Sequence, residues 1–83
     1  MSMEQLSTTA AKVVGIKQTT RAIIKGRVQI VFIANDADER LTKPLVEMCQ
    51  AQDLEYFQVT TMQELGKACG IHAGAAAAAI LKS

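Results

Sequence analysis

The chain has few of the residues from which catalytic and cofactor sites are built. It contains one histidine, two cysteines, one tyrosine, two phenylalanines and no tryptophan. This scarcity of nucleophiles, bases and metal ligands, together with the lack of a Walker or dinucleotide-binding glycine pattern, argues against an enzyme, a cofactor or a metal site. The scarcity of aromatic rings argues against a protein that binds single strands by stacking bases on aromatic side chains.

Long apolar runs and a secretion signal are missing as well. The amino terminus, Met-Ser-Met-Glu-Gln, has no apolar stretch after a basic one, and no apolar run approaches the roughly 20 residues of a membrane-spanning helix. Cys49 and Cys69 have neither metal-ligand spacing nor the density of a disulfide framework, so we expect small buried hydrophobic residues in a reduced setting. These absences predict a cytoplasmic protein with no membrane partner.

Length and charge predict one domain with a basic end. A chain of 83 residues, 49% apolar and 20% charged, has room for a single domain, residues 1–83, with a small core. The net charge of +1 gives little overall attraction to nucleic acid, but five basic residues and no acidic one lie from Lys12 to Arg27. Acidic residues follow in the next third of the chain: Asp36, Asp38, Glu39, Glu47, Asp53 and Glu55.

Hydrophobic periodicity predicts two helices in the first third of the chain. The first is predicted from about Gln5 to Val14, with apolar positions at helical spacing that include Ala10, and it runs into Gly15. The second begins at Gly15 and ends at Gly26, a residue suited to a left-handed helix stop. In this second helix we expect Ile16, Ile23 and Ile24 to be buried, opposite a row formed by Lys17, Arg21 and Lys25.

Strand and helix signals alternate in the rest of the chain. Residues 28–34, Val-Gln-Ile-Val-Phe-Ile-Ala, predict a central strand covered on both faces, followed by a turn over residues 35–38. A third helix follows, with Pro44 in its first turn and Leu41, Leu45, Met48 and Cys49 at helical intervals. Residues 56–60 predict a second strand, with Tyr56 and Phe57 in the core.

The last part of the chain contains one clear helix and one ambiguous segment. Thr61-Met62-Gln63-Glu64 has the order of a capping box, and Gly70 is placed to end the helix in a Schellman stop, leaving His72, Ala73 and Gly74 in an exposed loop. Residues 75–81 favour a helix by alanine propensity, yet a short buried strand fits equally. The alternation predicts an α/β domain with helices on both sides of a small sheet.

The start of the second helix has the chemistry of a nucleic-acid contact. Lys17, Arg21 and Lys25 lie at four-residue spacing, so they repel one another unless a negative partner is present, although a solvated surface helix has the same pattern. Gly15 leaves backbone N–H groups free at the positive end of the helix dipole, and Gln18 can both donate and accept. Arg21 can offer paired donors to a phosphate or to guanine.

Other candidate sites are weaker. The lone His72 lies beside glycines, where an exposed polar contact is more common than a catalytic base. Asp36 and Asp38 are two carboxylates without further oxygen ligands, so helix capping is the better interpretation than a divalent-ion site. Lys12 and Lys67 are expected on the solvated surface.

Three separated motifs together resemble the kink-turn-binding ribosomal-protein superfamily of the L-seven-Ae and L-thirty-e type. They are residues 15–22 (Gly-x-Lys-Gln-Thr-x-Arg-Ala), residues 34–38 (Ala-x-Asp-Ala-Asp) and residues 65–71 (Leu-Gly-Lys-Ala-Cys-Gly-Ile) leading into Gly-Ala-Ala at residues 74–76. The resemblance covers essentially the whole chain and is nearest to the small bacterial YbxF type. It implies a three-layer α-β-α sandwich with a mixed sheet of about four strands, in which residues 75–81 form a strand.

The resemblance also implies a binding mode. Members insert the start of the second helix into the widened major groove of a kink-turn, an RNA internal loop bent around tandem sheared G·A pairs. Asp36 would support the basic helix residues or accept from a base, and Ile71 would cover a flipped-out base. The predicted RNA-binding residues are Gly15, Ile16, Lys17, Gln18, Arg21, Asp36, Ile71, His72, Ala73 and Gly74.

The resemblance implies an RNA-binding protein without catalysis or cofactor, whose partner is structured RNA that contains a kink-turn, with the ribosome or a riboswitch as candidates. We expect this protein to be a monomer. The archaeal pattern has Asn-Glu in place of Lys17-Gln18 and Arg-Pro in place of Ala73-Gly74. The bacterial type shares the substitutions, which exchange an acceptor carboxylate for an amide and remove a cation from the loop but keep the binding mode. Two other classes stay open. A protein-interaction module of the same fold would use the acidic third helix, Glu39 to Glu47, and a small-molecule enzyme would need a concave pocket with perturbed ionisable groups.

Overall fold

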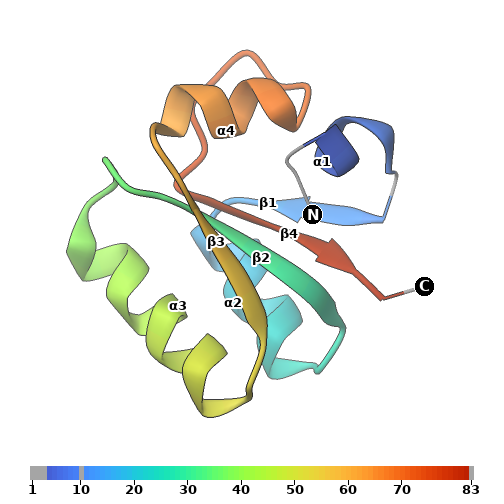
Figure 1. Cartoon of the computed structure of the whole chain (residues 1–83), viewed down its shortest axis with the longest axis vertical. Helices are drawn as coiled ribbons and strands as arrows, with labels where there is room; N and C mark the ends of the chain where they lie inside the picture. Colours follow the sequence, from blue (N-terminus) through green and yellow to red (C-terminus); the bar gives the residue numbers. More distant parts are fainter. Residues whose placement is uncertain (1–3, 10, 83) are drawn as a thin grey trace.

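A four-stranded mixed sheet forms the middle layer of the structure, a computed structural model that describes residues 4–9 and 11–82 (Figure 1). Helices cover both faces of the sheet, as expected for an α-β-α sandwich. In chain order the elements are α1 (Glu4–Thr8), β1 (Lys12–Val14), α2 (Ile16–Ile24), β2 (Val28–Ala34), α3 (Glu39–Ala51), β3 (Glu55–Val59), α4 (Met62–Ala68) and β4 (Ala77–Leu81).

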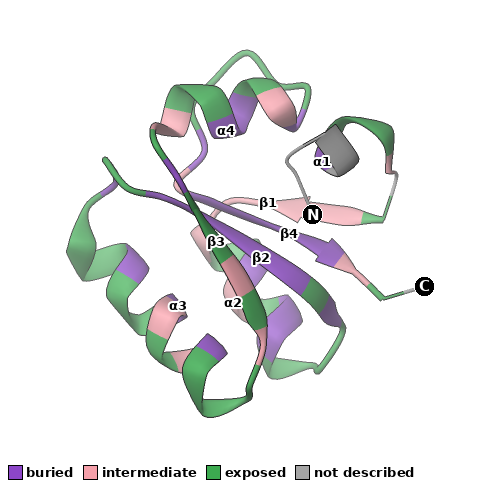
Figure 2. Cartoon of the chain, in the orientation of Figure 1, coloured by how far each residue is buried: buried purple, intermediate pink, exposed green. Residues whose placement is uncertain are grey.

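The strands lie in the order β1-β4-β2-β3. β2 pairs in parallel with β3, and β4 pairs antiparallel with both β1 and β2. The two inner strands, β2 and β4, are the most deeply buried segments of the chain (Figure 2). The central strand predicted at residues 28–34 is confirmed, because a run of β-branched residues suits a strand that is covered on both faces.

β4 is an inner strand built largely of alanine. Ala77, Ala78 and Ala79 are fully buried, and successive side chains point to opposite faces of the sheet. Alanine favours a helix when it is exposed, but pairing on both edges and burial on both faces outweigh a propensity of less than about 1 kcal/mol per residue. The interpretation as a strand, which the resemblance favoured over propensity, is therefore confirmed.

Two hydrophobic clusters lie on the two faces of the sheet. One joins α1 and α4 to the sheet through Leu6, Phe32 and Leu65, and the other joins α2 and α3 through Ile23, Val31 and Leu45. Both cysteines are free and buried, as predicted, and they belong to different clusters. Burial raises the pKa of both thiols, which disfavours the reactive thiolate.

The predicted first helix is wrong in its second half. α1 ends at Thr8, and Lys12–Val14 form the edge strand β1, which pairs with β4. Ala10 lies outside the described residues. Lys12 is also not purely solvated, because its Nζ donates to the carbonyl oxygen of Leu6 at 2.7 Å. Three residues are too few for a strand period to be recognised in the sequence, so the partner strand determines this element.

The second helix forms as predicted, but one of its isoleucines faces solvent. Ile23 is fully buried, whereas Ile24 is 70% exposed. Ile24 follows Lys17 by seven residues and Arg21 by three, so helical geometry places it on the cationic face and not opposite to it. Gly26 ends the helix with φ +69°, as expected for a left-handed stop.

Two expectations for α3 and β3 also need correction. Pro44 lies in the second turn of α3, because Asp38 caps the helix by accepting from the Arg40 N–H at 2.9 Å. Phe57 is 37% exposed and not in the core, because β3 is an edge strand, although its ring lies 6.0 Å from that of Phe32. Tyr56 is half-buried and its hydroxyl accepts from Gln50.

A buried hydroxyl in α2 gives a stability prediction. Thr19 is fully buried, and its Oγ1 has no hydrogen-bond partner among the residues that the structure describes. Leaving such a group unpaired costs about 1–3 kcal/mol, and valine has nearly the same shape without the hydroxyl. Thr19→Val should therefore raise the free energy of unfolding by about 1 kcal/mol and Tm by roughly 4–8 °C. A lower Tm in thermal unfolding would contradict the prediction.

Candidate nucleic-acid interface

Three segments predicted to bind RNA meet at one end of the sheet. The amide of Gly15, at the start of α2, donates to the carbonyl of Ala77 at 2.7 Å. The amide of Ala34, just before the turn at residues 35–38, donates to the carbonyl of Ala76 at 2.9 Å. Because residues 76 and 77 follow the connection from α4, the start of α2, this turn and the α4–β4 connection lie together (Figure 1).

Gly15 holds α2 in an orientation that exposes its first amides. Its backbone has φ +102° and ψ 156°, a region that is essentially restricted to glycine. No side chain caps the helix, and within the described residues the N–H groups of residues 16–18 have no acceptor. The helix therefore presents unpaired donors at the positive end of its dipole.

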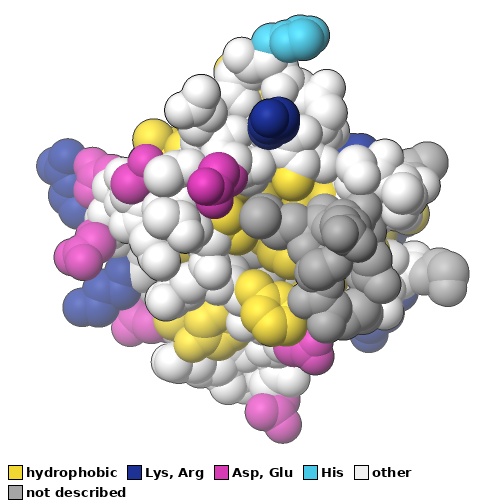
Figure 3. Space-filling view, turned by 45° about the horizontal axis from the view of Figure 1, so that its top comes forward, with side chains coloured by type: hydrophobic (Ala, Val, Ile, Leu, Met, Phe, Trp, Pro, Cys, Tyr) yellow, Lys and Arg dark blue, Asp and Glu magenta, His cyan; other side chains and the backbone are white. Residues whose placement is uncertain are grey.

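The polar side chains of the first turns of α2 are free to bind a ligand. Lys17, Gln18 and Arg21 are exposed and have no hydrogen-bond or ion-pair partner in the described part of the chain, and Ile16 is half-buried. The surface over α3 differs, because there acidic side chains accompany the basic ones (Figure 3). Arg40 of α3, for example, pairs with Asp38 at 2.7 Å, and this contact lowers the pKa of the Asp38 carboxyl.

Asp36 has a structural contact that the sequence did not indicate. Its Oδ1 accepts from the N–H of Met62, the first residue of α4, at 2.7 Å. Among the described residues it forms no ion pair with Lys17 or Arg21, so it does not support the basic helix residues directly. Instead, Asp36 fixes the start of α4 relative to the turn after β2.

The α4–β4 connection has the geometry predicted for a Schellman stop. Thr61 caps α4 by accepting from the Glu64 N–H at 3.0 Å, and Gly70 at φ +81° ends the helix. The N–H of Ile71 then donates to the carbonyl of Gly66 at 3.1 Å. Ile71 is 38% exposed, which is unusual for a large apolar side chain at a helix stop, and residues 72–74 are exposed as predicted.

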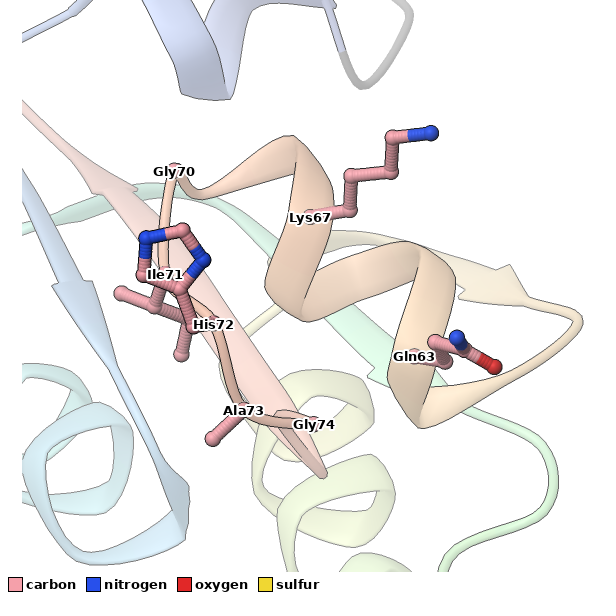
Figure 4. Close-up of a pocket in the computed structure, with 7 residues that line it drawn as sticks. All are labelled: Gln63, Lys67, Gly70, Ile71, His72, Ala73 and Gly74. Carbon is pink, nitrogen blue, oxygen red and sulfur yellow. The ribbon is translucent and has the colours of Figure 1, made fainter.

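A hollow of about 450 Å³ lies between this connection and α4. Figure 4 shows Gln63 and Lys67 on α4 and the remaining lining residues on the connection, which comprises residues 70–74. Sequence reasoning missed Gln63 and placed Lys67 on the solvated surface. The spacing of four residues between them indicates a shared helix face, but only the fold shows that the connection folds back beside that face.

Close backbone packing fixes the connection against α4. A Cβ atom at Gly66 would overlap the carbonyl oxygen of Ala73, and one at Gly74 would lie 3.2 Å from the Cβ of Met62. The amide of Ala75 also donates to the carbonyl of Met62 at 3.0 Å. Glycine at position 66 is therefore required for the observed path of residues 71–74.

One family of known proteins matches almost the whole sequence. The model of the ribosomal protein L7Ae/L30e/S12e/Gadd45 family matches residues 2–83. The chain belongs to this family. The resemblance seen in the three sequence motifs is thereby confirmed.

Curated members of the L7Ae/L30e/S12e/Gadd45 family align along most of the chain. An RNA-binding protein of Caldanaerobacter subterraneus is 44% identical over 68 residues, which cover 82% of this chain and 83% of that one. The RNA-binding protein YbxF of Geobacillus stearothermophilus is 38% identical over 82 residues, or 99% and 100% of the two chains. The solved 15.5kD RNA binding protein of Giardia lamblia has a TM-score of 0.87 at 23% identity and covers 98% of this chain and 68% of that one, which shows a shared fold.

Other kinds of site are not found in this L7Ae-family chain within the described residues. No group of three or more His, Cys, Asp or Glu side chains is placed to hold a metal ion in residues 4–9 and 11–82. None of the described helices combines the length and apolarity needed to span a bilayer. What the structure does bring together is a set of unpaired donors and cations at one end of the sheet.

Proposed function

We propose that this L7Ae-family protein is a single domain that binds structured RNA and recognises kink-turns, without catalysing a reaction. The observation that carries the proposal is the meeting of the α2 start with the α4–β4 connection at one end of the sheet. Within residues 4–9 and 11–82, the start of α2 has free amides and unpaired cations, and the α4–β4 connection has an exposed apolar side chain next to a hollow. The names of the aligned relatives, which call them RNA-binding proteins, support the same proposal.

The proposed contact is made by the tip of α2. The deep major groove of ordinary A-form RNA is too narrow for side chains to read, whereas a kink-turn widens it. Lys17 and Gln18 would contact the edges of the sheared guanines, and Arg21 would bind a base edge or a phosphate. Gly15 allows the RNA to approach the backbone, because the space that a Cβ atom would occupy there has no atom within 4 Å.

The α4–β4 connection would complete the site. Ile71 offers an apolar surface for an unstacked base, and His72, Ala73 and Gly74 border the same hollow. Because residues 66 and 74 pack closely on their neighbours, this surface is formed before RNA binds. A preformed surface reduces the ordering cost of binding.

Binding would act by population shift. RNA that exchanges between extended and kinked forms is driven toward the kinked form by the difference in affinity of the protein for the two. We propose a monomer that needs no metal or cofactor and acts on kink-turns such as those of ribosomal RNA or riboswitches. The family description, which names ribosomal proteins, makes ribosomal RNA the first target to test.

A matched pair of RNAs tests the proposed function. Titration of the protein with a kink-turn, and with the same RNA whose G·A pairs are replaced by Watson–Crick pairs, should show binding to the second that is weaker by roughly 30-fold or more. The loss reflects two base contacts at about 1–3 kcal/mol each. Equal affinity for both RNAs at several salt concentrations would reject kink-turn recognition, because phosphate contacts alone bind both.

Arg21→Ala tests the role of α2. Arg21 is exposed and unpaired among the described residues, so the fold should survive while binding of the kink-turn weakens by about 1–3 kcal/mol. Lys43→Ala removes the same charge from the exposed face of α3 and should leave affinity within about 0.5 kcal/mol of the original. If Lys43→Ala weakens binding and Arg21→Ala does not, the partner docks on α3, as in the alternative protein-interaction module.

A further inference from the structure

One edge of the sheet is open along the whole length of a strand. β3 is the outermost strand in the order β1-β4-β2-β3, and among the described residues no strand pairs with its far side. Most of β3 is exposed or half-buried, in contrast to the buried β2 beside it (Figure 2). The edge of β3 is therefore accessible to another strand.

The end of β3 shows which peptide groups face the open edge. The N–H of Asn35 donates to the carbonyl of Val59 at 2.7 Å, so the backbone of Val59 is directed toward β2. Because alternate residues of a strand direct their N–H and C=O groups to opposite edges, those of Tyr56 and Gln58 point away from β2. These groups are the ones that an added strand can bond.

β3 lacks the features that protect a strand edge from pairing. Natural edge strands are shortened, bulged, or interrupted by proline or lysine. β3 is five residues long, contains no proline or lysine, and keeps a continuous register with β2 from Glu55 to Val59. The opposite edge strand, β1, is three residues long and carries Lys12. The contrast between the two edges indicates an interaction surface on β3.

An aromatic ring lies on each face of this edge. The side chain of Phe57 is 37% exposed, and its ring stacks on that of Phe32 with the centroids 6.0 Å apart. On the other face, Tyr56 packs against the cluster of α2 and α3, and its hydroxyl accepts from Gln50 at 3.2 Å. The two rings offer apolar and cation-binding surfaces to the alternate side chains of an added strand.

The part of the chain that contains this edge is acidic, which selects among possible partners. Residues 44–66 contain no lysine, arginine or histidine. They contain exposed acids that form no ion pair within the described part of the chain: Glu47, Asp53, Glu55 and Glu64. A second copy of the chain would bring the same acids to the shared edge, where like charges repel, whereas a basic segment would be attracted.

We propose that the open edge of β3 binds an extended basic segment of another protein by strand addition. The main chain of that segment would bond to the peptide groups of Tyr56 and Gln58, and its lysine or arginine side chains would lie beside Glu55 and the two aromatic rings. Glu55 pairs with Ile30 near the start of β2, whereas the proposed RNA contact lies where β2 ends. This surface is therefore separate from the one proposed for RNA.

A synthetic peptide tests the strand addition. The probe has about seven residues, enough to cover β3, in which lysine and valine alternate. In the full chain, the amides of Tyr56 and Gln58 should exchange rapidly with solvent and become protected roughly 10-fold or more when the peptide saturates. One control peptide carries glutamate in place of lysine, and another is methylated at each of its middle backbone nitrogens. Neither should protect these amides.

Three variants separate the backbone contribution from the charge. Gln58→Pro removes an N–H from the open edge, where proline is tolerated, and should weaken peptide binding roughly 10-fold or more. Glu55→Gln should weaken it about 2- to 5-fold at low salt. Glu39→Gln removes the same charge at the start of α3 and should change nothing. Thermal unfolding checks each variant, and Glu55→Gln carries the test if Gln58→Pro does not fold.

Several outcomes would overturn the proposal. Protection by the methylated peptide, equal affinity for the lysine and glutamate peptides, or equal losses from Glu55→Gln and Glu39→Gln would each reject strand addition by a basic segment. Sedimentation of the free chain tests the other occupant, because dimers that Gln58→Pro abolishes would assign the edge to a second copy. Glu55→Gln should bind kink-turn RNA as the original chain does, so failure of kink-turn recognition would reject the proposed function and leave this inference standing.

Discussion

Gly66→Ala is expected to destabilise the protein by about 2–3 kcal/mol and to weaken RNA binding at the same time. The added methyl group would overlap the carbonyl oxygen of Ala73, a backbone atom that cannot move without displacing residues 71–74. Overpacking of this kind costs typically about 1–3 kcal/mol and occasionally more. Overlap with a backbone atom places the cost at or above the upper end of this range, so about 2–3 kcal/mol is left after the gain of up to about 1 kcal/mol in helix propensity when alanine replaces glycine.

The measurement is thermal unfolding combined with titration of a kink-turn RNA. Tm should fall on the order of 10–20 °C, and the affinity of the remaining folded protein should fall as Ile71 and its neighbours leave their positions. Lys67 is the next residue of α4 and is exposed, so Lys67→Ala is the control for stability and should move Tm by only a few degrees. An unchanged or higher Tm for Gly66→Ala would show that the connection does not pack on α4 as described.

Gly15→Ala is expected to cost about 1–3 kcal/mol of stability for a different reason. A Cβ at this position meets no atom within 4 Å, so there is no steric overlap with the rest of the fold. The cost arises from the backbone, because φ +102° with ψ 156° is a conformation that residues with a side chain avoid. Relaxation of that strain would rotate the start of α2, so RNA affinity should fall with stability.

Substitution by asparagine at Gly15 and at Gly26 distinguishes the backbone strain at Gly15 from an ordinary left-handed turn. Gly26, at φ +69°, lies in the left-handed helical region that asparagine tolerates, so Gly26→Asn should cost less than about 1 kcal/mol. Gly15→Asn should cost about as much as Gly15→Ala. Denaturant unfolding of these variants measures both differences, and equal costs at the two positions would contradict the special backbone conformation of Gly15.

Much of the architecture could be predicted because local signals agreed with the final packing. The apolar run at residues 28–34 formed the central strand, and the capping box at Thr61 and the glycine stops at residues 26 and 70 formed where expected. Each of these signals acts within a few residues of the chain. The alanines of β4 gave no such signal, and the family resemblance decided between helix and strand.

The predictions that were wrong or incomplete concern residues whose structure is determined by partners far away along the chain. β1 exists because Lys12, Val13 and Val14 pair with residues 78–80, far along the chain. The exposure of Phe57 follows from the edge position of β3, and the pairing of Asp36 with Met62 follows from the packing of two turns. Periodicity and propensity do not contain this information.

The candidate site was predicted residue by residue from the resemblance, and the fold adds its neighbours. Gln63 and Lys67 border the hollow beside residues 70–74. Their side chains are ordinary for exposed positions, so composition did not distinguish them. Which of these residues contact RNA stays a prediction that the proposed variants test.

The hydrogen bonds from Gly15 to Ala77 and from Ala34 to Ala76 have a consequence for biosynthesis. The start of α2 and the turn after β2 are translated early, but both are anchored to a segment that leaves the ribosomal exit tunnel much later. A nascent chain that stops short of residue 77 has the cations of α2 without the scaffold that orients them. Recognition of folded RNA should therefore appear abruptly, once β4 has left the tunnel and paired with its neighbours, and not grow gradually as the chain lengthens.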